Sequence, residues 1–214
     1  MCLSRRGQAH HVGTGAGVPV LRSCRASDDN ARMAHPPTEA AIAPPRLFFA
    51  LWPDPATAAR LADWAVHAQL AYGGRVMRTD TLHLTLAFLG AATPAQVAEL
   101  GAATAARRIA PATLALARYG LFARQRIVWA GPQQADAALA ALHDDLWAWL
   151  RALGWPAPQQ GFQPHVTLLR NVDAHAAAPA PPPPVAWRYD HYALVQSQPW
   201  HGRASYRVLA RTAA

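Results

Sequence analysis

The sequence contains no lysine, and all 20 of its basic residues are arginine. Lysine is the nucleophile of Schiff-base and nucleotidyl-enzyme chemistry, so both are excluded. A glycine-rich phosphate loop with its lysine is excluded on the same ground, and no Gly-x-Ser-x-Gly nucleophile motif occurs. With only 12 acidic residues the formal net charge is +8, which favours anionic partners such as nucleic acids or phosphate esters.

Cysteine is scarce as well, because Cys2 and Cys24 are the only two and the chain has none after them. This distribution excludes an internal disulfide framework, a thiol nucleophile in the body of the protein and a cysteine zinc site. We therefore expect a reducing, cytoplasmic environment. No apolar run approaches the roughly 18 residues that are needed to span a bilayer, so we expect no membrane segment.

The first 43 residues differ in composition from the rest. Gly, Ser, Ala, Arg and Pro dominate there, and no helical or strand periodicity persists. We expect residues 1–43 to be a disordered tail, or the product of a start assigned upstream of the true one, with Met33 a candidate initiator. Residues 44–214 are expected to form a single two-lobed domain.

Apolar periodicity predicts helices over about residues 56–71, 94–108 and 136–153. Strands are predicted over residues 46–52, 81–90, 113–121, 126–130, 164–170, 187–196 and 205–211, the third and fourth forming a hairpin. Because strand–helix–strand order occurs in both halves, we expect an α+β, bilobal fold. It should contain two mostly antiparallel sheets, outer helices and a central cleft.

Two of the predicted strands carry the same polar pair, in His83-Leu84-Thr85-Leu86 and in His165-Val166-Thr167-Leu168. Side chains two residues apart on a strand share a face. Each histidine should therefore point with its threonine toward a cleft or water, while the aliphatic residues are buried. A single strand histidine is more often structural than catalytic. The repetition of the pair indicates two halves that meet around one site.

A pair of histidines can divide acid–base work, because one can remove a proton from a nucleophile while the other donates to a leaving oxygen. A threonine hydroxyl two residues along can donate to a phosphoryl oxygen. The competing hypothesis is a zinc site, but neither motif contains the third protein ligand that such sites use. We therefore expect phosphoryl chemistry with no metal and no cofactor.

The two motifs resemble the double signature of the 2H phosphoesterase superfamily. Within it they are most similar to RNA 2′,3′-cyclic phosphodiesterases, once described as 2′-5′ RNA ligases. The likeness runs over about residues 46–210 and includes the opening strand from Arg46 and the Phe88-Leu89-Gly90 that follows the first motif. It implies a bilobal fold with the motifs facing each other across a cleft.

The resemblance also implies roles and a reaction. His83 would be the proton donor to the leaving 3′ oxygen, and His165 the proton acceptor that activates water. The substrates would be RNA with 2′,3′-cyclic phosphate ends, or cyclic nucleotides, opened to a 2′-phosphomonoester. The alternatives are a phosphodiesterase for other cyclic or 2′-5′-linked nucleotides, and an RNA-end-binding module without turnover. We expect a monomer.

Several further residues are candidates for substrate contact. Thr85, Thr167, Arg170 and Arg126 could bind phosphate, and Phe48 could stack on a base, although a core role is favoured for Phe48. Strict alternation points Arg170 with Val166 and Leu168, away from the histidines, unless the strand ends or twists there. The other histidines of the body are expected on the surface: His67, His143, His175, His191 and His201.

Overall fold

Helices and strands alternate along the chain in the computed structural model, which describes residues 46–200 and 203–213. These residues belong to one compact unit, Ile42–Ala214. The expectations for residues 1–43 and for His201 lie outside the described residues. The elements are β1 (Arg46–Leu51), α1 (Pro55–Tyr72), β2 (Arg75–Val76), the 3₁₀ turn η1 (Thr79–Thr81), β3 (Leu84–Ala91), α2 (Pro94–Ala105), β4 (Ala112–Leu116), β5 (Arg118–Phe122), β6 (Ile127–Gly131), α3 (Ala137–Ala152), β7 (Val166–Arg170), β8 (Val185–Tyr189), β9 (Ala193–Trp200) and β10 (Arg203–Arg211).

Each of the three α-helices begins directly after a side chain that caps its free amide groups. Asp54 accepts hydrogen bonds from the amides of Ala56 and Thr57 at the start of α1. Thr93 opens α2 in a reciprocal capping box with Gln96, and Asp136 caps α3. Such caps satisfy orphan donors and fix where a helix starts. The predicted helices are confirmed to within a few residues at their ends.

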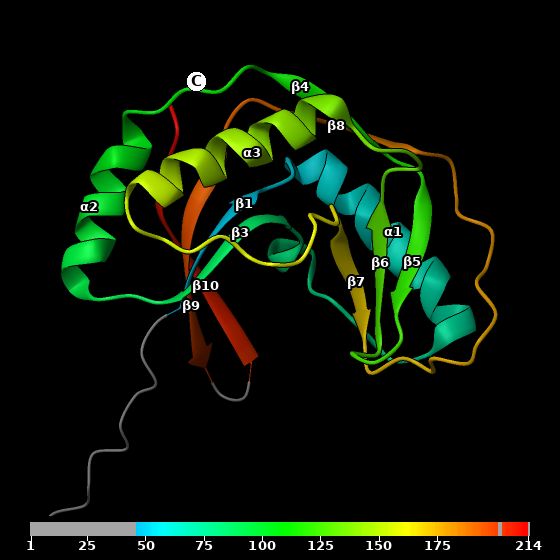
Figure 1. Cartoon of the computed structure of the whole chain (residues 1–214). Coiled ribbons are helices and arrows are strands. Elements are labelled where there is room, and N and C mark those ends of the chain that lie inside the picture. Colours follow the sequence, from blue (N-terminus) through cyan, green and yellow to red (C-terminus); the bar gives the residue numbers. More distant parts are fainter. Residues whose placement is uncertain (1–45, 201–202, 214) are drawn as a thin grey trace, which may run out of the picture. The chain divides into compact units, whose positions relative to one another are not determined.

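Eight strands form one antiparallel sheet in the order β10-β9-β1-β3-β7-β6-β5, with β2 added beside β7. The sheet is narrowest between β3 and β7, where a single residue pair, Leu84 with Val166, joins the strands. It therefore consists of a first half-sheet, β10-β9-β1-β3, and a second half-sheet, β7-β6-β5 (Figure 1). The expected α+β class with antiparallel sheets is confirmed.

The helices cover these half-sheets and enclose the core. Helix α1 packs on β6 and β7, α2 packs on β9 and β10, and α3 contacts both β3 and β4 (Figure 1). Leu84, Leu86, Val166 and Leu168 are all buried in the core that the helices cover. The aliphatic side of each His-x-Thr strand is thus buried as predicted, and the opposite side is left for the polar residues.

Two predicted strands are each divided between sheets. The run 113–121 breaks at Ala117 into β4 and β5, and the run 187–196 breaks after Tyr189 into β8 and β9. Strands β4 and β8 pair with each other in a separate two-stranded sheet, while β5 pairs with β6 in the predicted hairpin. Apolar residues lie on both sides of each break, so the sequence pattern did not reveal the change of partner.

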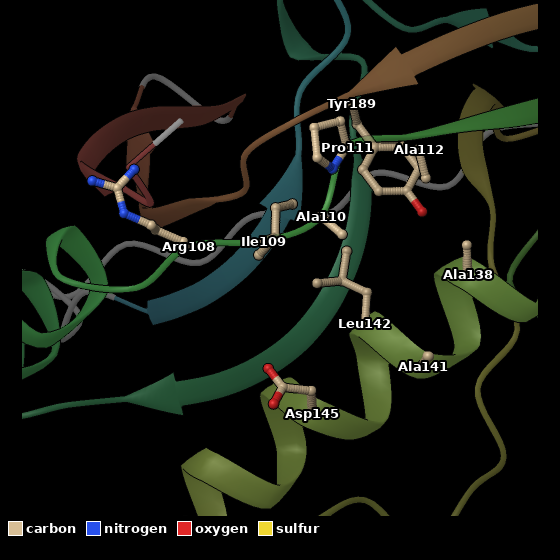
Figure 2. A pocket seen from close by; sticks show the side chains of 10 residues that line it. All are labelled: Arg108, Ile109, Ala110, Pro111, Ala112, Ala138, Ala141, Leu142, Asp145 and Tyr189. Carbon is tan, nitrogen blue, oxygen red and sulfur yellow. The ribbon is translucent and has the colours of Figure 1, made fainter.

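A hollow of about 400 Å³ lies beside this small sheet, between α3 and residues 108–112 (Figure 2). Tyr189 and Leu142 line it, and the Tyr189 hydroxyl is buried without a hydrogen-bond partner. None of the residues that the sequence predicts for phosphoryl chemistry lines this hollow. The two His-x-Thr motifs lie instead at the junction of the half-sheets, where β3 meets β7.

The burial of Leu84 at the junction predicts that its substitution lowers the stability of the fold. Leu84 is fully buried and forms the only residue pair between β3 and β7. Leu84→Ala should lower the free energy of unfolding by about 2–5 kcal/mol, because burial is lost and a cavity remains. Urea denaturation measures this change. Leu70→Ala, at an exposed leucine of α1, is the control and should change stability little. A loss at Leu84 no larger than at Leu70 would contradict the role given to the junction.

Candidate active site

The pairing of Leu84 with Val166 sets the positions of the two motifs. Continued by one residue in each direction, this antiparallel register places His83 opposite Thr167 and Thr85 opposite His165. All four side chains are partly exposed, whereas their neighbours Leu84 and Val166 are buried. The histidines are diagonal neighbours in this register, a relation in which two Cβ atoms typically lie somewhat less than about 7–8 Å apart.

Both histidine rings are held in the same way by the backbone. His83 Nδ1 donates to the carbonyl oxygen of Thr81 at 2.7 Å, and His165 Nδ1 donates to that of Gln163 at 2.8 Å. A carbonyl oxygen can only accept, so each Nδ1 carries the proton and each neutral ring has an unprotonated Nε2. The two residues thus present equivalent Nε2 atoms as base, or as acid once protonated.

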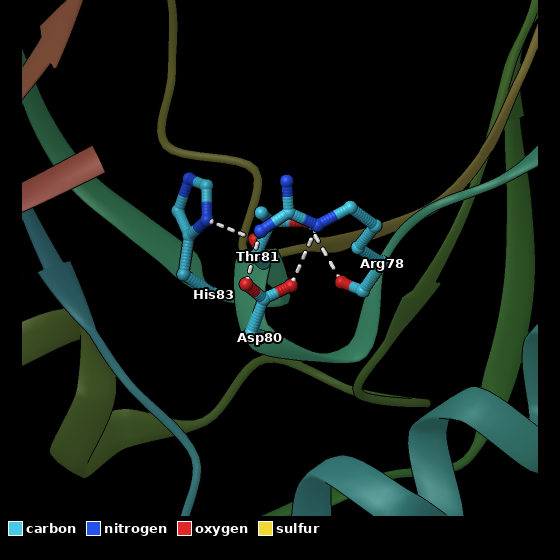
Figure 3. Close-up of polar contacts among 4 residues, drawn as sticks. All are labelled: Arg78, Asp80, Thr81 and His83. Carbon is cyan, nitrogen blue, oxygen red and sulfur yellow. Dashed lines mark hydrogen bonds and ion pairs between the residues drawn. The ribbon is translucent and has the colours of Figure 1, made fainter. Parts of the chain in front are cut away.

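A short ion-paired turn holds the carbonyl that positions His83 (Figure 3). In η1 the Thr81 hydroxyl donates to the carbonyl of Arg78 at 2.7 Å, and the guanidinium of Arg78 bonds Asp80 through two nitrogens. A side chain that bonds a neighbouring backbone group in this way stabilises a turn. Asp80, the acid nearest to the first motif, is therefore paired with Arg78 within this turn.

Aromatic rings surround His83. The indole of Trp52 stacks on it at 5.0 Å and 13°, Phe48 lies at 5.1 Å, and Tyr206 meets it edge-on at 5.2 Å. Phe48 lies within β1 and Trp52 directly follows its last residue, Leu51; the two are four positions apart and therefore share a face. Trp52 and Tyr206 were not predicted for the site. Trp52 shares strand parity with Phe48, which could have identified Trp52 as a neighbour of His83. No local pattern in the sequence links Tyr206 to His83.

His165 has a different aromatic neighbourhood on the second half-sheet. Phe122 meets its ring edge-on at 5.0 Å, and Trp129 lies at 6.1 Å. The indole of Trp129 covers Gly120 on the neighbouring strand. A Cβ atom at Gly120 would come within 2.0 Å of that indole, so only glycine fits there. Gly120 thereby leaves the space that Trp129 needs beside His165.

Burial separates the two histidines electrostatically. The pKa of His83 is lowered to about 4, mainly by burial and in addition by the positive charges of His165 and Arg170, against the opposing effect of the Thr81 carbonyl. Burial and the charge of Arg170 also lower the pKa of His165. At neutral pH both rings are therefore neutral in the ligand-free chain. A bound phosphate anion would favour protonation of either ring, because an adjacent opposite charge stabilises the imidazolium.

Arg170 lies in the site because β7 contains a bulge. Trp129 pairs with Thr167 and Val128 with Leu169, so Leu168 is an extra residue in the strand. Leu168 and Leu169 are both fully buried, and the alternation is reversed after them. The charge of Arg170 accordingly acts on His83, His165 and Tyr206. The expectation from strict alternation that Arg170 points away from the histidines is wrong.

The structure does not place two other candidates, Arg126 and Phe48, for the substrate contacts expected of them. The guanidinium of Arg126 donates to the carbonyl oxygens of Val172 and Asn171, beyond the far end of β7. At about 3.3 Å per residue, that point is roughly 20 Å along the chain from His165, so the structure does not bring Arg126 to the histidines. Phe48 is only 4% exposed and packs beneath His83, which leaves no free ring face for a base.

The remaining histidines fall into two groups. His67 bonds the hydroxyl of Tyr119, and His191 pairs with Asp190, both outside the site. His175 is exposed in the loop after β7. His143 was also expected on the surface, but it lines a cleft together with Thr85 and His165. Its ring stacks on Phe162 at 4.0 Å and 13°.

Among residues 46–200 and 203–213, no three His, Cys, Asp or Glu side chains gather in a way that could hold a metal ion. None of the helices within these ranges is long and apolar enough to cross a membrane. The two histidines, their threonines and Arg170 remain as the group suited to acid–base work on an anion.

Comparisons with known proteins point to one family. The sequence profile described as 2′-5′ RNA ligase superfamily matches residues 53–198. The RNA 2′,3′-cyclic phosphodiesterase of Escherichia coli (strain K12) is 34% identical over 172 residues, which cover 79% of this chain and 97% of that protein. The enzyme of the same name from Geobacillus stearothermophilus is 38% identical over 102 residues, or 45% of this chain and 32% of that protein.

Solved structures agree with these matches. The crystal structure of E. coli LigT complexed with 3′-AMP superimposes with a TM-score of 0.69 at 30% identity, covering 78% of this chain and 97% of that chain. The apo form of LigT gives the same TM-score at 31% identity, covering 78% and 96%. A crystal structure of a protein from Thermus thermophilus gives a TM-score of 0.59 at 27% identity, with the same coverage.

The electrostatics of the site can be checked by NMR titration of the ring nitrogens. Both His83 and His165 should be Nδ1–H tautomers at pH 7, because a carbonyl accepts from each Nδ1. As the pH falls, His83 should become protonated only near pH 4, and His165 below its ordinary 6.5. Trp52→Ala is the matched variant and should raise the His83 midpoint, since burial is the main cause of its shift. A His83 midpoint at or above 6.5 in the natural chain would contradict this description.

Proposed function

The chain belongs to the 2′-5′ RNA ligase superfamily, and from this premise we propose that it hydrolyses the terminal 2′,3′-cyclic phosphate of RNA to a 2′-phosphomonoester. The relatives from E. coli and Geobacillus stearothermophilus carry the name of that activity. The match extends over almost the whole length of the E. coli protein. Fold and relatives together give the reaction class. The roles of individual residues are our proposal and rest on the geometry of the junction.

The proposal rests on one observation. Two histidines on neighbouring strands are both locked as Nδ1–H tautomers, and both present Nε2 beside a threonine of the other motif. An in-line displacement at phosphorus needs a base beside the nucleophile and an acid beside the leaving oxygen. Two Nε2 atoms on opposite sides of one phosphoryl group meet that requirement without a third participant.

The proposed reaction proceeds in one displacement. His165 Nε2 takes a proton from water as the water oxygen bonds to phosphorus. The bond from phosphorus to the 3′ oxygen breaks, and His83 Nε2 donates its proton to that oxygen. The assignment of His83 as donor follows the family resemblance. The aromatic surroundings of His83 suit this role, because burial among apolar rings disfavours the imidazolium and so makes it a stronger proton donor.

The other members of the site stabilise charge. Thr85 and Thr167 donate hydroxyl groups to the nonbridging phosphoryl oxygens, and Arg170 offsets the charge that develops on them. We assign Phe48, with Trp52 and Tyr206, to holding His83 and not to stacking on a base, because of its burial. Arg126 has no part in this scheme, because its guanidinium bonds backbone carbonyls beyond the far end of β7. No metal takes part in this scheme.

One chain supplies both histidines, so the proposal is for an enzyme that acts as a monomer. We propose the cytoplasm as its location, which the lack of cysteine after residue 24 suits. The alternative of an RNA-end-binding module differs only in turnover. Both histidines and both threonines are present in the geometry described, which favours the enzyme.

His83→Ala and His165→Ala should each lower kcat by about 10²–10⁴-fold, as expected for the loss of a general acid or base. Thr85→Ala and Thr167→Ala should cost less, roughly 1.5–3 kcal/mol for one hydrogen bond to a charged acceptor. The assay is turnover of 2′,3′-cyclic AMP, with circular dichroism to check folding. His175→Ala, at an exposed histidine outside the site, should remain near the natural rate. Near-natural turnover in either site-histidine variant would refute the mechanism.

The identity of the broken bond gives a separate test. With the 3′ oxygen beside His83, the product should be a terminal 2′-phosphate, which phosphorus NMR distinguishes from a 3′-phosphate. The same reaction run after exhaustive chelation should proceed at an unchanged rate. A predominantly 3′-phosphate product would reverse the proposed orientation of the substrate, and a rate restored only by a divalent ion would overturn the metal-free scheme.

A further inference from the structure

Arg118 of β5 lies on the open face of the second half-sheet, the face that carries His165. Its neighbour Tyr119 packs against the buried core, as does Leu121. Because side chains alternate along a strand, Arg118 projects to the other side of the sheet. An arginine that has no role in the catalytic scheme thus stands on the same face as the residues proposed for phosphoryl transfer.

The sheet register places Arg118 two strands away from His165. Arg118 pairs with Gly131 of β6. The register between β6 and β7, continued by one residue, puts Gly131 opposite His165. Gly131 contributes no side chain to this row, and the indole of Trp129 occupies the space, since a Cβ atom at Gly131 would come within 2.5 Å of that ring.

The indole of Trp129 lies between Arg118 and His165. The guanidinium carbon of Arg118 is 4.9 Å from the ring centre of Trp129, and the ring centre of His165 is 6.1 Å from that of Trp129. These two distances place the guanidinium carbon at most about 11 Å from the His165 ring. Adjacent phosphates of an RNA chain are separated by only one sugar. A guanidinium at this distance can therefore reach the phosphate next to one that is held at the histidines.

The side chain of Arg118 is held in place while most of its donors stay available. Its Nε donates to the carbonyl oxygen of Pro132 at 2.8 Å, and its contact with Trp129 uses the flat face of the guanidinium. Within residues 46–200 and 203–213, its two terminal nitrogens have no hydrogen-bond partner and no acidic side chain is ion-paired with it. A planar guanidinium with open N–H groups matches the oxygens of a phosphate.

We propose that Arg118 binds the phosphodiester that joins the terminal nucleotide of the RNA to the one before it. The inference rests on the proposed function and extends it from the terminal phosphate to the chain behind it. A cyclic mononucleotide has no such phosphodiester and cannot use Arg118. The site should therefore prefer the end of an RNA chain to a cyclic mononucleotide.

Two substrates test this contact: 2′,3′-cyclic AMP, and an adenosine dinucleotide that ends in a 2′,3′-cyclic phosphate. Arg118→Ala should raise KM for the dinucleotide by about 5- to 50-fold, between the effects of an exposed ion pair and of a hydrogen bond to a charged group. The loss should be confined to the dinucleotide and should leave kcat unchanged. Arg188→Ala removes the same charge from an exposed position of β8, and as the control it should keep both KM values near those of the natural chain.

A neutral linkage in the dinucleotide gives a second test. Replacing its phosphodiester by a methylphosphonate removes the charge and should raise KM of the natural chain by a similar factor. In Arg118→Ala the charged and neutral dinucleotides should have nearly equal KM, because the group that binds the charge is gone. The salt dependence of log KM for the charged dinucleotide should become shallower by about 0.7 in Arg118→Ala, since one phosphate contact to a single strand is lost.

The outcomes distinguish the contact from the proposed function. An unchanged KM for the dinucleotide in Arg118→Ala would overturn the contact. An equal loss on both substrates would overturn it as well, because Arg118 would then act only by holding Trp129 beside His165.

If the natural chain turns over neither substrate, the proposed function fails, and calorimetry decides the contact by itself. The ligands are then 2′-AMP and the dinucleotide that ends in a 2′-phosphate. Binding of the dinucleotide alone weakened by Arg118→Ala would support the contact without turnover. Equal binding by both proteins, or no binding of the dinucleotide by the natural chain, would overturn it.

Discussion

A single pair of buried residues determines the geometry of this protein. Leu84 and Val166 are the only contact between β3 and β7 in the sheet ladder, and through them one half-sheet continues into the other. Because side chains alternate along a strand, burying these two residues turns the polar residue on either side of each toward the open face. The site is thus a consequence of how the core is packed. A slip of one residue in this register would bury the histidines and expose the aliphatic residues.

The two histidines are alike in how they are held and different in what surrounds them. A backbone carbonyl two residues earlier fixes each tautomer, which makes the rings interchangeable as proton carriers. The three rings around His83 are packed more closely than the pair beside His165, and His83 accordingly has the strongly lowered pKa. The electrostatic difference between the two histidines therefore arises from the neighbouring strands and not from the motifs themselves.

Local pattern was sufficient to predict the three helices, the two His-x-Thr strands and the face on which their polar residues lie. It failed where one extra residue or one distant partner decides the outcome. Leu168 is such an extra residue, and it brings Arg170 to the histidines against the alternation. The division of run 113–121 between two sheets depends on β8, some 70 residues away. Tyr206 and His143 reach the site only through the folded arrangement, so no spacing in the sequence indicates them.

Gly120 shows how an empty position can be as restrictive as a catalytic one. Its role is to leave room for the indole of Trp129, which in turn lies beside His165. Every other amino acid would introduce at least one carbon into that space and displace the indole toward its neighbours. Substitution tolerance on β5 is therefore governed from the adjacent strand. A loss-of-function allele at residue 120 would act on the chemistry of His165 while leaving every polar group of the site unaltered.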